Sequence, residues 1–379
     1  MSHDSLCFFF SELRDLRASS VTSVTENSAP LMTSPLSLDL TLTPTTDPTS
    51  VYRYRDGLYA ADLLTAAITE FDLFTWLAAH PSDLAAICHH FGTAERPTDV
   101  MLTLFTANNF IRRAPDAAFH ATALAREHLV STSPFFLGPY YASTKERPVV
   151  KDFITILRTD RPANWASYQD EKTWTEAMLT DAFATTFTAA MDCRGFTLGP
   201  ALAKKIPAAG RTRLLDIAGG SGIYACTIAA HHPHLTATVF ERPPVDGIAR
   251  RMIEKRGYTA RVAVVAGDMF TDPLPRDHDI HLFSNVLHDW DVAKVRPLLA
   301  ASFAALPPGG LLVIHDAHLN ADKTGPLPVA AYSALLMSVT EGKCYATSEL
   351  ETLLAAAGFR DFAFAETIAD RSVMTALKP

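Results

Sequence analysis

The chain has 379 residues, of which 48% are hydrophobic and 20% are charged, the composition of a globular protein that can build a large apolar core. This length is more than twice the ~150 residues of an average domain, so we expect two domains. The 41 acidic residues outnumber the 33 basic ones and give a formal net charge of −8. The composition excludes a mostly disordered chain, and the negative charge argues against nucleic acid as a partner.

The cysteines form no C-x-x-C pair; they are Cys7, Cys88, Cys193, Cys226 and Cys344. Their scatter argues against a metal site and against a disulfide framework, and it fits a protein of the reducing cytoplasm. No uninterrupted apolar run approaches the ~18 residues that a membrane span requires, so no membrane association is expected. The apolar cluster at 7–10 lacks a preceding basic region, which makes it a poor signal peptide.

The composition changes twice along the chain. In residues 1–50, 22 side chains are Ser, Thr or Pro, and such a segment cannot bury enough apolar surface to offset its ordering entropy. We therefore predict a disordered tail over 1–50. Apolar residues at helical spacing follow, and the pattern changes again near Arg211. We predict a helical domain over 51–205 and a second domain over 206–379.

Within the helical domain, the segment 84–113 has the pattern helix, turn, helix, short strand, which is the layout of a winged helix. Residues 51–113 contain five basic and seven acidic side chains, and the helix predicted at 98–109 carries no Lys or Arg. A helix that reads DNA needs cations for phosphate and base contacts. We therefore expect this unit to serve protein–protein packing rather than DNA binding. The segment 114–205 is rich in aromatic residues, which could form core or the wall of a pocket for a flat ligand.

In the second domain, short apolar strands alternate with helices. Strands are predicted at 213–217, 235–240, 261–266, 280–284 and 311–315, and helices between them at 223–231 and 292–305. Such alternation predicts an α/β fold with an open, doubly wound parallel sheet that is covered on both faces. Two further strands, at 359–365 and 373–377, are expected to close one edge of the sheet.

A glycine-rich turn, D-I-A-G-G-S-G at 216–222, ends the first of these strands. Gly219, Gly220 and Gly222 would let the chain turn tightly and let a ligand approach the backbone, at the strand end where open sheets bind ligands. Glu241 ends the second strand 21 residues after Gly220, where a carboxylate can accept hydrogen bonds from a ribose diol. Together these features predict a site for a nucleoside.

Two cofactors fit that prediction. The turn and Ala225 also match the weaker G-x-G-x-x-A fingerprint of dinucleotide sites. However, the carboxylate of Asp216 would repel a pyrophosphate, whereas it would attract the ammonium of a methionine moiety. Asp268 and Met269, after the third strand, offer a carboxylate and a thioether to hold the edge and face of an adenine. We therefore favour S-adenosylmethionine over NAD; a glycine turn that binds nothing would leave these three signals unexplained.

His288 follows the fourth strand and would face the same crevice as the glycine turn. A neutral imidazole, with a pKa of about 6.5, can take the proton from a hydroxyl that attacks a methyl donor. The alternative is that His288 and Asp289 only cap the next helix, but the position at a strand end favours catalysis. A carboxylate that orients the second ring nitrogen would improve the base. Asp316, at the end of the fifth strand, is the first candidate and Glu341 the second; either could instead be a solvated loop carboxylate.

Four motifs occur in a characteristic order: DIAGGSG at 216–222, GDMF at 267–270, LHDWD at 287–291 and ELETLLAAAGF at 349–359. With them the sequence resembles the S-adenosylmethionine-dependent O-methyltransferases of the plant caffeate and acetylserotonin (hydroxyindole) type, in particular their bacterial relatives, from about residue 52 to the end. The resemblance implies a class I methyltransferase domain, which is Rossmann-like, and an all-α N-terminal domain with a winged-helix dimerisation unit. It also implies a homodimer.

The resemblance assigns roles to individual residues. His288 would be the general base, and Asp316 stands at the position of the family's first histidine-orienting glutamate. The implied cofactor contacts are Gly219, Glu241, Asp268 and Met269, and the implied lining of the acceptor pocket is Phe183, Phe187, Met191 and Met337.

The sequence departs from the family pattern at three places. Ala218 replaces the first glycine of the loop. Ser284 stands where plant members keep a lysine that contacts the cofactor, so we expect Ser284 at the cofactor site with altered geometry. The second supporting glutamate is replaced, with Cys344 near its position and Glu341 three residues earlier.

The leading hypothesis is an S-adenosylmethionine-dependent O-methyltransferase of secondary metabolism that methylates a hydroxyl on a small aromatic acceptor. We expect this hydroxyl to be phenolic. The alternative is an enzyme that binds the cofactor but catalyses decarboxylation, hydroxylation or a pericyclic reaction, because relatives on this scaffold have lost methyl transfer. A third hypothesis is a regulator that senses the cofactor and binds DNA, against which the acidic segment 84–113 argues.

Overall fold

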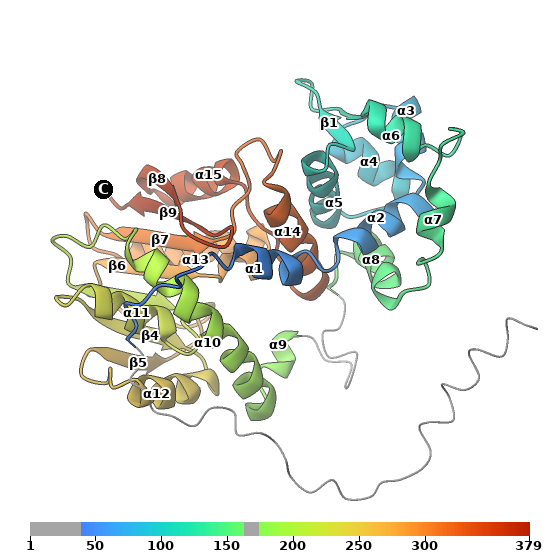
Figure 1. Ribbon diagram of the computed structural model, residues 1–379. Helices are drawn as coiled ribbons and strands as arrows, with labels where there is room; N and C mark the ends of the chain where they lie inside the picture. The colour runs from blue at the N-terminus through green and yellow to red at the C-terminus, as the bar shows by residue number, and fades with distance from the viewer. Residues whose placement is uncertain (1–38, 163–173) are drawn as a thin grey trace, which may run out of the picture. The chain divides into compact units, whose positions relative to one another are not determined.

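The computed structural model describes residues 39–162 and 174–379 (Figure 1). Residues 1–38 of the predicted tail lie outside the described residues. In the remaining part of that segment, Leu40 is 4% exposed and packs into an apolar cluster beside the sheet. The tail over 1–50 stays a prediction.

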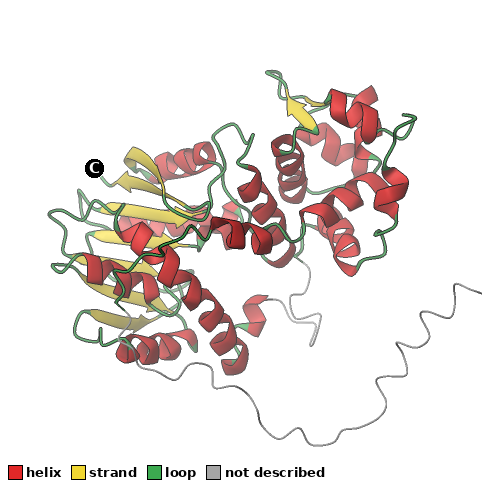
Figure 2. Cartoon of the chain, viewed as in Figure 1, coloured by secondary structure: helices red, strands yellow, loops and turns green. Residues whose placement is uncertain are grey.

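The first half of the described chain is mainly helical (Figure 2). Its elements are α1 (Thr49–Asp56), α2 (Ala60–Thr69), α3 (Leu73–Ala79), α4 (Leu84–Phe91), α5 (Glu95–Ala107), β1 (Ile111–Arg113), β2 (Phe119–Ala121), α6 (Ala123–His128), α7 (Gly138–Ala142) and α8 (Pro148–Thr159). The helix–turn–helix–strand pattern predicted over 84–113 is therefore confirmed as α4, α5 and β1. Strands β1 and β2 pair antiparallel as a short hairpin.

The second helix of this unit packs within the chain, and the predicted protein–protein packing of the unit stays a prediction. The apolar residues of α5 are almost completely buried; they are Val100, Met101, Leu102, Leu104 and Phe105. They belong to one apolar cluster with α2, α8 and α14 (Leu327–Val339), although α14 comes more than 200 residues later in the chain. This face of α5 is therefore part of the core and not available to DNA.

The second half contains the main sheet. Its strands are β3 (Arg213–Ile217), β4 (Thr236–Glu241), β5 (Val262–Ala266), β6 (Ile280–Ser284), β7 (Leu311–Asp316), β8 (Arg360–Glu366) and β9 (Ser372–Leu377). Within the described residues these strands form a seven-stranded sheet of order β5-β4-β3-β6-β7-β9-β8. The five strands β3 to β7 are parallel to one another. Strands β9 and β8 are added antiparallel at the β7 edge. The predicted α/β sheet and its closing pair are confirmed.

Helices cover both faces of the sheet because strand side chains alternate between them. On one face Leu214, Leu282 and Val313 share a cluster with α10 (Asp181–Ala203), α11 (Ile223–His231) and α12 (Val245–Lys255). On the other face Leu215 and Phe283 share a cluster with α13 (Val292–Ala305) and α15 (Thr347–Ala357). This double cover is the class I methyltransferase fold predicted from the sequence.

Two helices depart from the predicted domain boundary at residue 205. Helix α10 precedes that boundary but packs on the sheet with α11, whereas α14 follows it and packs with α2 and α5. The domain boundaries themselves stay a prediction. No helix in the described ranges is long and apolar enough to cross a membrane.

The strand order reverses between β3 and β6, which are neighbours in the sheet although β4 and β5 separate them in the chain. Open parallel sheets bind ligands at such a switch point, outside the carboxyl ends of the strands. The glycine turn after β3 and the 3₁₀ turn η3 (Leu287–Asp289) after β6 both lie at this edge.

Candidate active site

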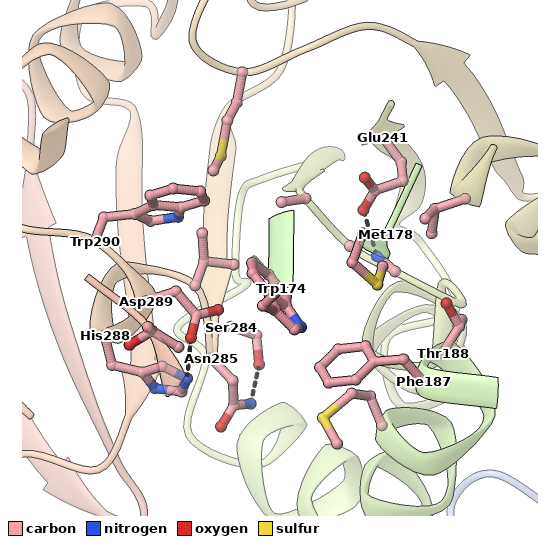
Figure 3. A pocket seen from close by; sticks show the side chains of 18 of the residues that line it. Trp174, Met178, Phe187, Thr188, Glu241, Ser284, Asn285, His288, Asp289 and Trp290 are labelled. Carbon is pink, nitrogen blue, oxygen red and sulfur yellow. Dashed lines mark hydrogen bonds and ion pairs between the residues drawn. The ribbon is translucent and has the colours of Figure 1, made fainter. Parts of the chain in front are cut away.

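A cavity of about 400 Å³ lies at the switch point and is lined by residues from four strand ends, α10 and α14 (Figure 3). Its size is within the usual range for small-molecule sites. One end is formed by the glycine turn and by residues after β4 and β5. The other end is formed by His288 with the residues around it, α10 and α14.

The glycine turn bends sharply because every second position from 218 to 222 needs an unusual backbone angle. Ala218 has φ of 54°, Gly220 of 57° and Gly222 of 72°, all in the left-handed region that favours glycine. Gly219 and Gly220 line the cavity, as predicted for backbone that approaches a ligand. Gly222 does not, because it faces the fold: a Cβ there would lie 2.8 Å from the Ile253 side chain.

Glu241 is held against the turn at the end of β4. One carboxylate oxygen accepts a hydrogen bond from Gly220 N at 2.9 Å and the other accepts one from Arg242 N at 2.9 Å. Burial raises the pKa of this carboxyl, and these two backbone donors oppose the shift. The side chain lines the cavity in the position predicted for a ribose-binding carboxylate.

Asp268 and Met269 follow β5 and both line the cavity. Asp268 accepts a hydrogen bond from Phe270 N at 2.8 Å, which fixes its side chain in the loop. Ser284, at the end of β6, also lines the cavity; its hydroxyl lies 2.9 Å from Nδ1 of His315. The structure thus brings the predicted cofactor residues Gly219, Gly220, Glu241, Asp268, Met269 and Ser284 to one cavity.

Asp216 is placed differently from its predicted contact with the cofactor. It is fully buried beneath the turn, outside the cavity lining, and a Cβ at Gly219 would lie 2.6 Å from its carboxyl carbon. Neither of its carboxylate oxygens has a hydrogen-bond partner among the described residues. Burial raises the pKa of Asp216 to about 7, and the nearby charge of Glu241 contributes to this shift. The carboxylate can therefore influence a cation in the cavity only through the turn.

His288 lies in η3 and lines the cavity, with Asp316 behind it. Its Nδ1 is hydrogen-bonded to an oxygen of Asp316, while Nε2 lies 3.5 Å from an oxygen of Asp289. Burial alone would lower the pKa of His288, but the carboxylates of Asp316 and Asp289 outweigh it and raise the pKa. The residue that caps the next helix, α13, is Asp291, whose side chain accepts a hydrogen bond from Lys294 N at 2.9 Å. His288 and Asp289 therefore do not have this alternative role. The structure thus unites the predicted histidine with its first predicted carboxylate.

Glu341 and Cys344 lie apart from that pair. Glu341 is half-exposed and forms an ion pair with Lys294, not with His288. Cys344 is completely buried, and burial raises the pKa of its thiol well above the ordinary value. The second predicted carboxylate is therefore not part of the histidine cluster in this structure.

The predicted acceptor residues separate into two groups. Phe187 and Met191 line the cavity from one face of α10. Phe183 lies outside the lining and stacks on Phe187, with ring centroids 6.0 Å apart and an angle of 12°. Met337 is completely buried in the core shared with α5, and α14 instead contributes Tyr332 and Leu336 to the cavity.

Several lining residues were not predicted from the sequence; they include Trp174, Met178, Arg194, Asn285, Trp290 and Tyr332. One signal was available for Arg194, because residues 187, 191 and 194 follow the i, i+4, i+7 spacing of one helix face. Tyr332 carried no such signal, since almost all of α14 is apolar and buried, and sequence alone does not show which side faces a cavity.

Comparison with known proteins identifies the family. Residues 156–360, more than half of the chain, match the model of the O-methyltransferase domain. The 3-hydroxy-5-methyl-1-naphthoate 3-O-methyltransferase of Streptomyces sahachiroi is 32% identical over 317 residues, which cover 82% of this chain and 89% of that protein.

Solved structures of similar proteins support this assignment to the O-methyltransferases. An O-methyltransferase family 2 protein from Planctomyces limnophilus, in complex with apigenin, has a TM-score of 0.81 at 32% identity and covers 90% of this chain and 99% of its own. Human N-acetylserotonin methyltransferase, in complex with S-adenosylmethionine, shares the fold, with a TM-score of 0.56 at 24% identity over 89% of this chain and 99% of its own. The chain belongs to the S-adenosylmethionine-dependent O-methyltransferases, as a relative of the bacterial and acetylserotonin members.

Proposed function

We propose that this enzyme methylates a phenolic hydroxyl of a small aromatic acceptor, with His288 as the general base. The observation that carries the proposal is the position of His288: it lines the cavity and its Nδ1 is bound to Asp316, so Nε2 is the ring nitrogen left for a substrate. A relative that acts on a hydroxynaphthoate and a similar structure that holds apigenin support an aromatic acceptor.

The cavity wall suits a flat ring. Trp174 and Phe187 meet edge to face with centroids 5.5 Å apart, and Phe270 and Trp290 do so at 4.7 Å. All four rings line the cavity. Aromatic walls bind planar ligands through large apolar contacts and a preferred ring geometry. Phe270 follows Met269 at the cofactor end, so Trp174 and Phe187 are the rings that we propose to hold the acceptor, with its hydroxyl directed toward the polar groups at the His288 end.

The residues at the other end fit the cofactor. The backbone of Gly219 and Gly220 lines the cavity, Glu241 is oriented toward the turn, and the carboxyl of Asp216 is buried beneath it. We propose that Gly219, Gly220 and Glu241 hold the ribose and methionine parts, with Asp268 and Met269 at the adenine. S-Adenosylmethionine supplies an electrophilic methyl group.

The proposed chemistry of His288 follows from its hydrogen bonds. A phenol has a pKa of about 10, so an unassisted hydroxyl is almost fully protonated near neutral pH. Neutral His288 would accept this proton at Nε2, and the Asp316 carboxylate at Nδ1 would stabilise the resulting imidazolium. The remaining catalysis would come from the cavity, which holds the reacting groups in line and keeps water away.

The test is incubation with S-adenosylmethionine and a panel of hydroxyindoles, catechols, naphthols and polyketide phenols. We expect a product that is heavier by one methyl group and an equal amount of S-adenosylhomocysteine. A converted acceptor without S-adenosylhomocysteine would instead support a non-methylating reaction.

We further propose that the helical domain is a winged-helix dimerisation unit, in which β1 and β2 are the wing after α4 and α5. Exposed apolar side chains near α6 and α7 support an interface there: Leu124, Phe135, Leu137 and Tyr140. Light scattering during size-exclusion chromatography should give the mass of a dimer. A monomer at micromolar concentration would contradict this proposal. The cytoplasmic location stays a prediction.

A further inference from the structure

Four cationic side chains line the cavity: Arg55, Arg194, Arg242 and Lys294. Two of these charges face carboxylates, because Lys294 pairs with Glu341 and Arg55 lies 3.6 Å from Asp56. Arg242 lies at the cofactor end, where it donates a hydrogen bond to a backbone carbonyl and lowers the pKa of Glu241 by its charge.

Arg194 differs from the other three cations. Its guanidinium lies 3.2 Å from the sulfur of Met191 and donates to the side-chain oxygen of Asn285 at 3.2 Å. Neither partner carries a charge. Arg194 forms no ion pair with any carboxylate of the described chain. The nearby Asp56 is already engaged by Arg371 at 2.9 Å.

The guanidinium of Arg194 stays protonated although the side chain is partly buried. Burial would lower the pKa of its guanidinium, but the surrounding acidic groups Tyr332, Tyr224 and Asp56 raise it above the ordinary value. Arg194 is partly buried, and an unpaired charge that is partly removed from water is costly, so in proteins it is normally balanced by a partner or a ligand. Since Arg194 lines the cavity, a bound molecule can supply the missing anion.

The position of Arg194 indicates which molecule that is. Its guanidinium contacts Met191, one of the implied acceptor residues, and Asn285, three residues before His288, so it lies at the end of the cavity where the acceptor hydroxyl is expected.

Asn285 holds the guanidinium in a fixed orientation. Its amide nitrogen donates to the Tyr224 hydroxyl at 3.1 Å and to the Ser284 hydroxyl at 3.2 Å, so its oxygen is directed toward Arg194. Asn285 has φ of 54°, a left-handed angle that Asn tolerates better than most residues. A pre-oriented guanidinium fork matches the two oxygens of a carboxylate.

We propose that Arg194 binds a carboxylate of the acceptor, so that the preferred substrates are hydroxyl-bearing aromatic acids. This inference rests on the proposed function, because it requires an aromatic acceptor in the same cavity. The substrate class implied by this proposal is an aryl ring that carries a hydroxyl near His288 and a carboxylate near Arg194.

The test compares hydroxynaphthoic acids with naphthols that carry the hydroxyl at the same position. For the unaltered enzyme we expect kcat/KM to be higher for the acids on the order of 10- to 100-fold, the usual effect of one charge-assisted contact. Arg194→Met should remove this preference by raising KM for the acids, with little change for the naphthols. Arg194→Lys should restore part of it. Arg250→Gln, an exposed arginine on α12, is the matched control and should behave like the unaltered enzyme.

Three results would overturn the inference, and they differ in what they leave standing. If Arg194→Met weakens S-adenosylhomocysteine binding in calorimetry and leaves the preference for acids, the guanidinium binds the carboxylate of the cofactor instead. If the unaltered enzyme methylates naphthols as well as acids, the substrate class is wrong while the proposed function stands. If it methylates neither, the proposed function fails as well. Circular dichroism of each variant identifies a loss of folding.

Discussion

At the scale of single residues, the His288–Asp316 pair explains how one imidazole can serve as a base in a buried site. Burial penalises the imidazolium, and the adjacent carboxylate offsets that penalty. Asp316 has its own pKa lowered to about 2, because the positive charge of His288 and their hydrogen bond outweigh burial. The carboxylate is therefore charged throughout the neutral range and can orient the ring.

The first prediction concerns Asp316→Asn. Without the carboxylate, the pKa of His288 should fall, because the group that favours the imidazolium is lost. The acid limb of the pH profile of kcat/KM should therefore move to lower pH, while kcat falls because the imidazolium is less stabilised. Steady-state rates measured across the acid limb provide the test. A profile that keeps its acid limb at the position of the unaltered enzyme would contradict the pairing.

The second prediction concerns the buried carboxyl of Asp216, whose pKa is raised to about 7. A carboxyl with a raised pKa costs stability when it ionises, so the free energy of unfolding should decrease as pH rises from about 4 through 7. A cationic cofactor favours the ionised form, so its affinity should increase over the upper part of that range. Asp216→Asn should therefore raise the thermal midpoint of the free enzyme at alkaline pH and remove the pH dependence of cofactor affinity.

Calorimetric titration with S-adenosylmethionine on both sides of neutrality, together with thermal unfolding, measures these two effects. Asp361→Asn changes an exposed carboxylate of β8 and is the control. Equal pH dependence in Asp216→Asn and in the unaltered enzyme would show that this carboxyl does not sense the cofactor.

At the scale of elements, the glycine turn combines two functions in one short segment. It must pass over Asp216 and must also present backbone to the cavity, and only a residue without a Cβ fits at position 219. The left-handed angle at Ala218 shows that the turn tolerates a methyl group there, where the family pattern has glycine. Position 219 has no such tolerance.

The third prediction follows from this contrast. In Gly219→Ala the new methyl group would lie 2.6 Å from the Asp216 carboxyl carbon, so the turn has to move. We expect cofactor affinity to fall about 10-fold or more, because backbone contacts are sensitive to such a shift. Gly247→Ala on α12 is the matched control, since its nearest neighbouring atom lies 3.7 Å away. If both variants bind S-adenosylhomocysteine equally well, the turn is not the tight contact that the structure indicates.

The sequence predicted the elements of the α/β domain well because their signals are local. The strands at 213–217 and 280–284 and the helices at 223–231 and 292–305 match the structure residue for residue. These segments are short apolar runs with clear turn residues between them. His288 and Asp316 could be paired from sequence because both follow parallel strands, whose carboxyl ends meet at one edge.

The remaining site residues depend on tertiary packing, which local patterns do not contain. Met337 is buried in the core while Leu336 faces the cavity, because the rotation of α14 is set by its contacts with α5. Glu341 was a reasonable partner for His288 by position in the chain, but Lys294 is the cation that it meets. Arg194 could be placed on a helix face, yet nothing in the sequence shows that its charge lacks a partner.

At the scale of the whole molecule, an ion network connects the helical part to the sheet part. Asp99 on α5 and Glu349 on α15 share the ammonium groups of Lys323 and Lys343, with distances of 2.6 to 2.8 Å. Burial would raise the pKa of Asp99, but the two lysines outweigh it and lower the pKa. A lowered pKa means that this carboxylate stabilises the fold above its unfolded pKa and that the stabilisation is lost as pH falls.

The fourth prediction measures this network. Lys343 is the more buried of the two lysines, so Lys343→Met would leave Asp99 and Glu349 close together with one cation. We expect the free energy of unfolding to fall by about 3 kcal/mol, the usual cost of removing one partner from a buried network. Lys151→Met breaks an exposed ion pair with Glu146 and should cost less than about 1 kcal/mol. Urea denaturation that gives the same small change for both variants would show that the network does not hold the two parts together.

The proposed catalytic role of His288 is tested most directly by the turnover number of His288→Gln, with an acceptor from the panel and with cofactor affinity measured in parallel. We predict that kcat falls about 100-fold or more, since general-base catalysis is lost, while the affinity for S-adenosylhomocysteine stays as it is in the unaltered enzyme. An unchanged kcat in a variant that binds the cofactor normally would contradict the role of His288 as the base.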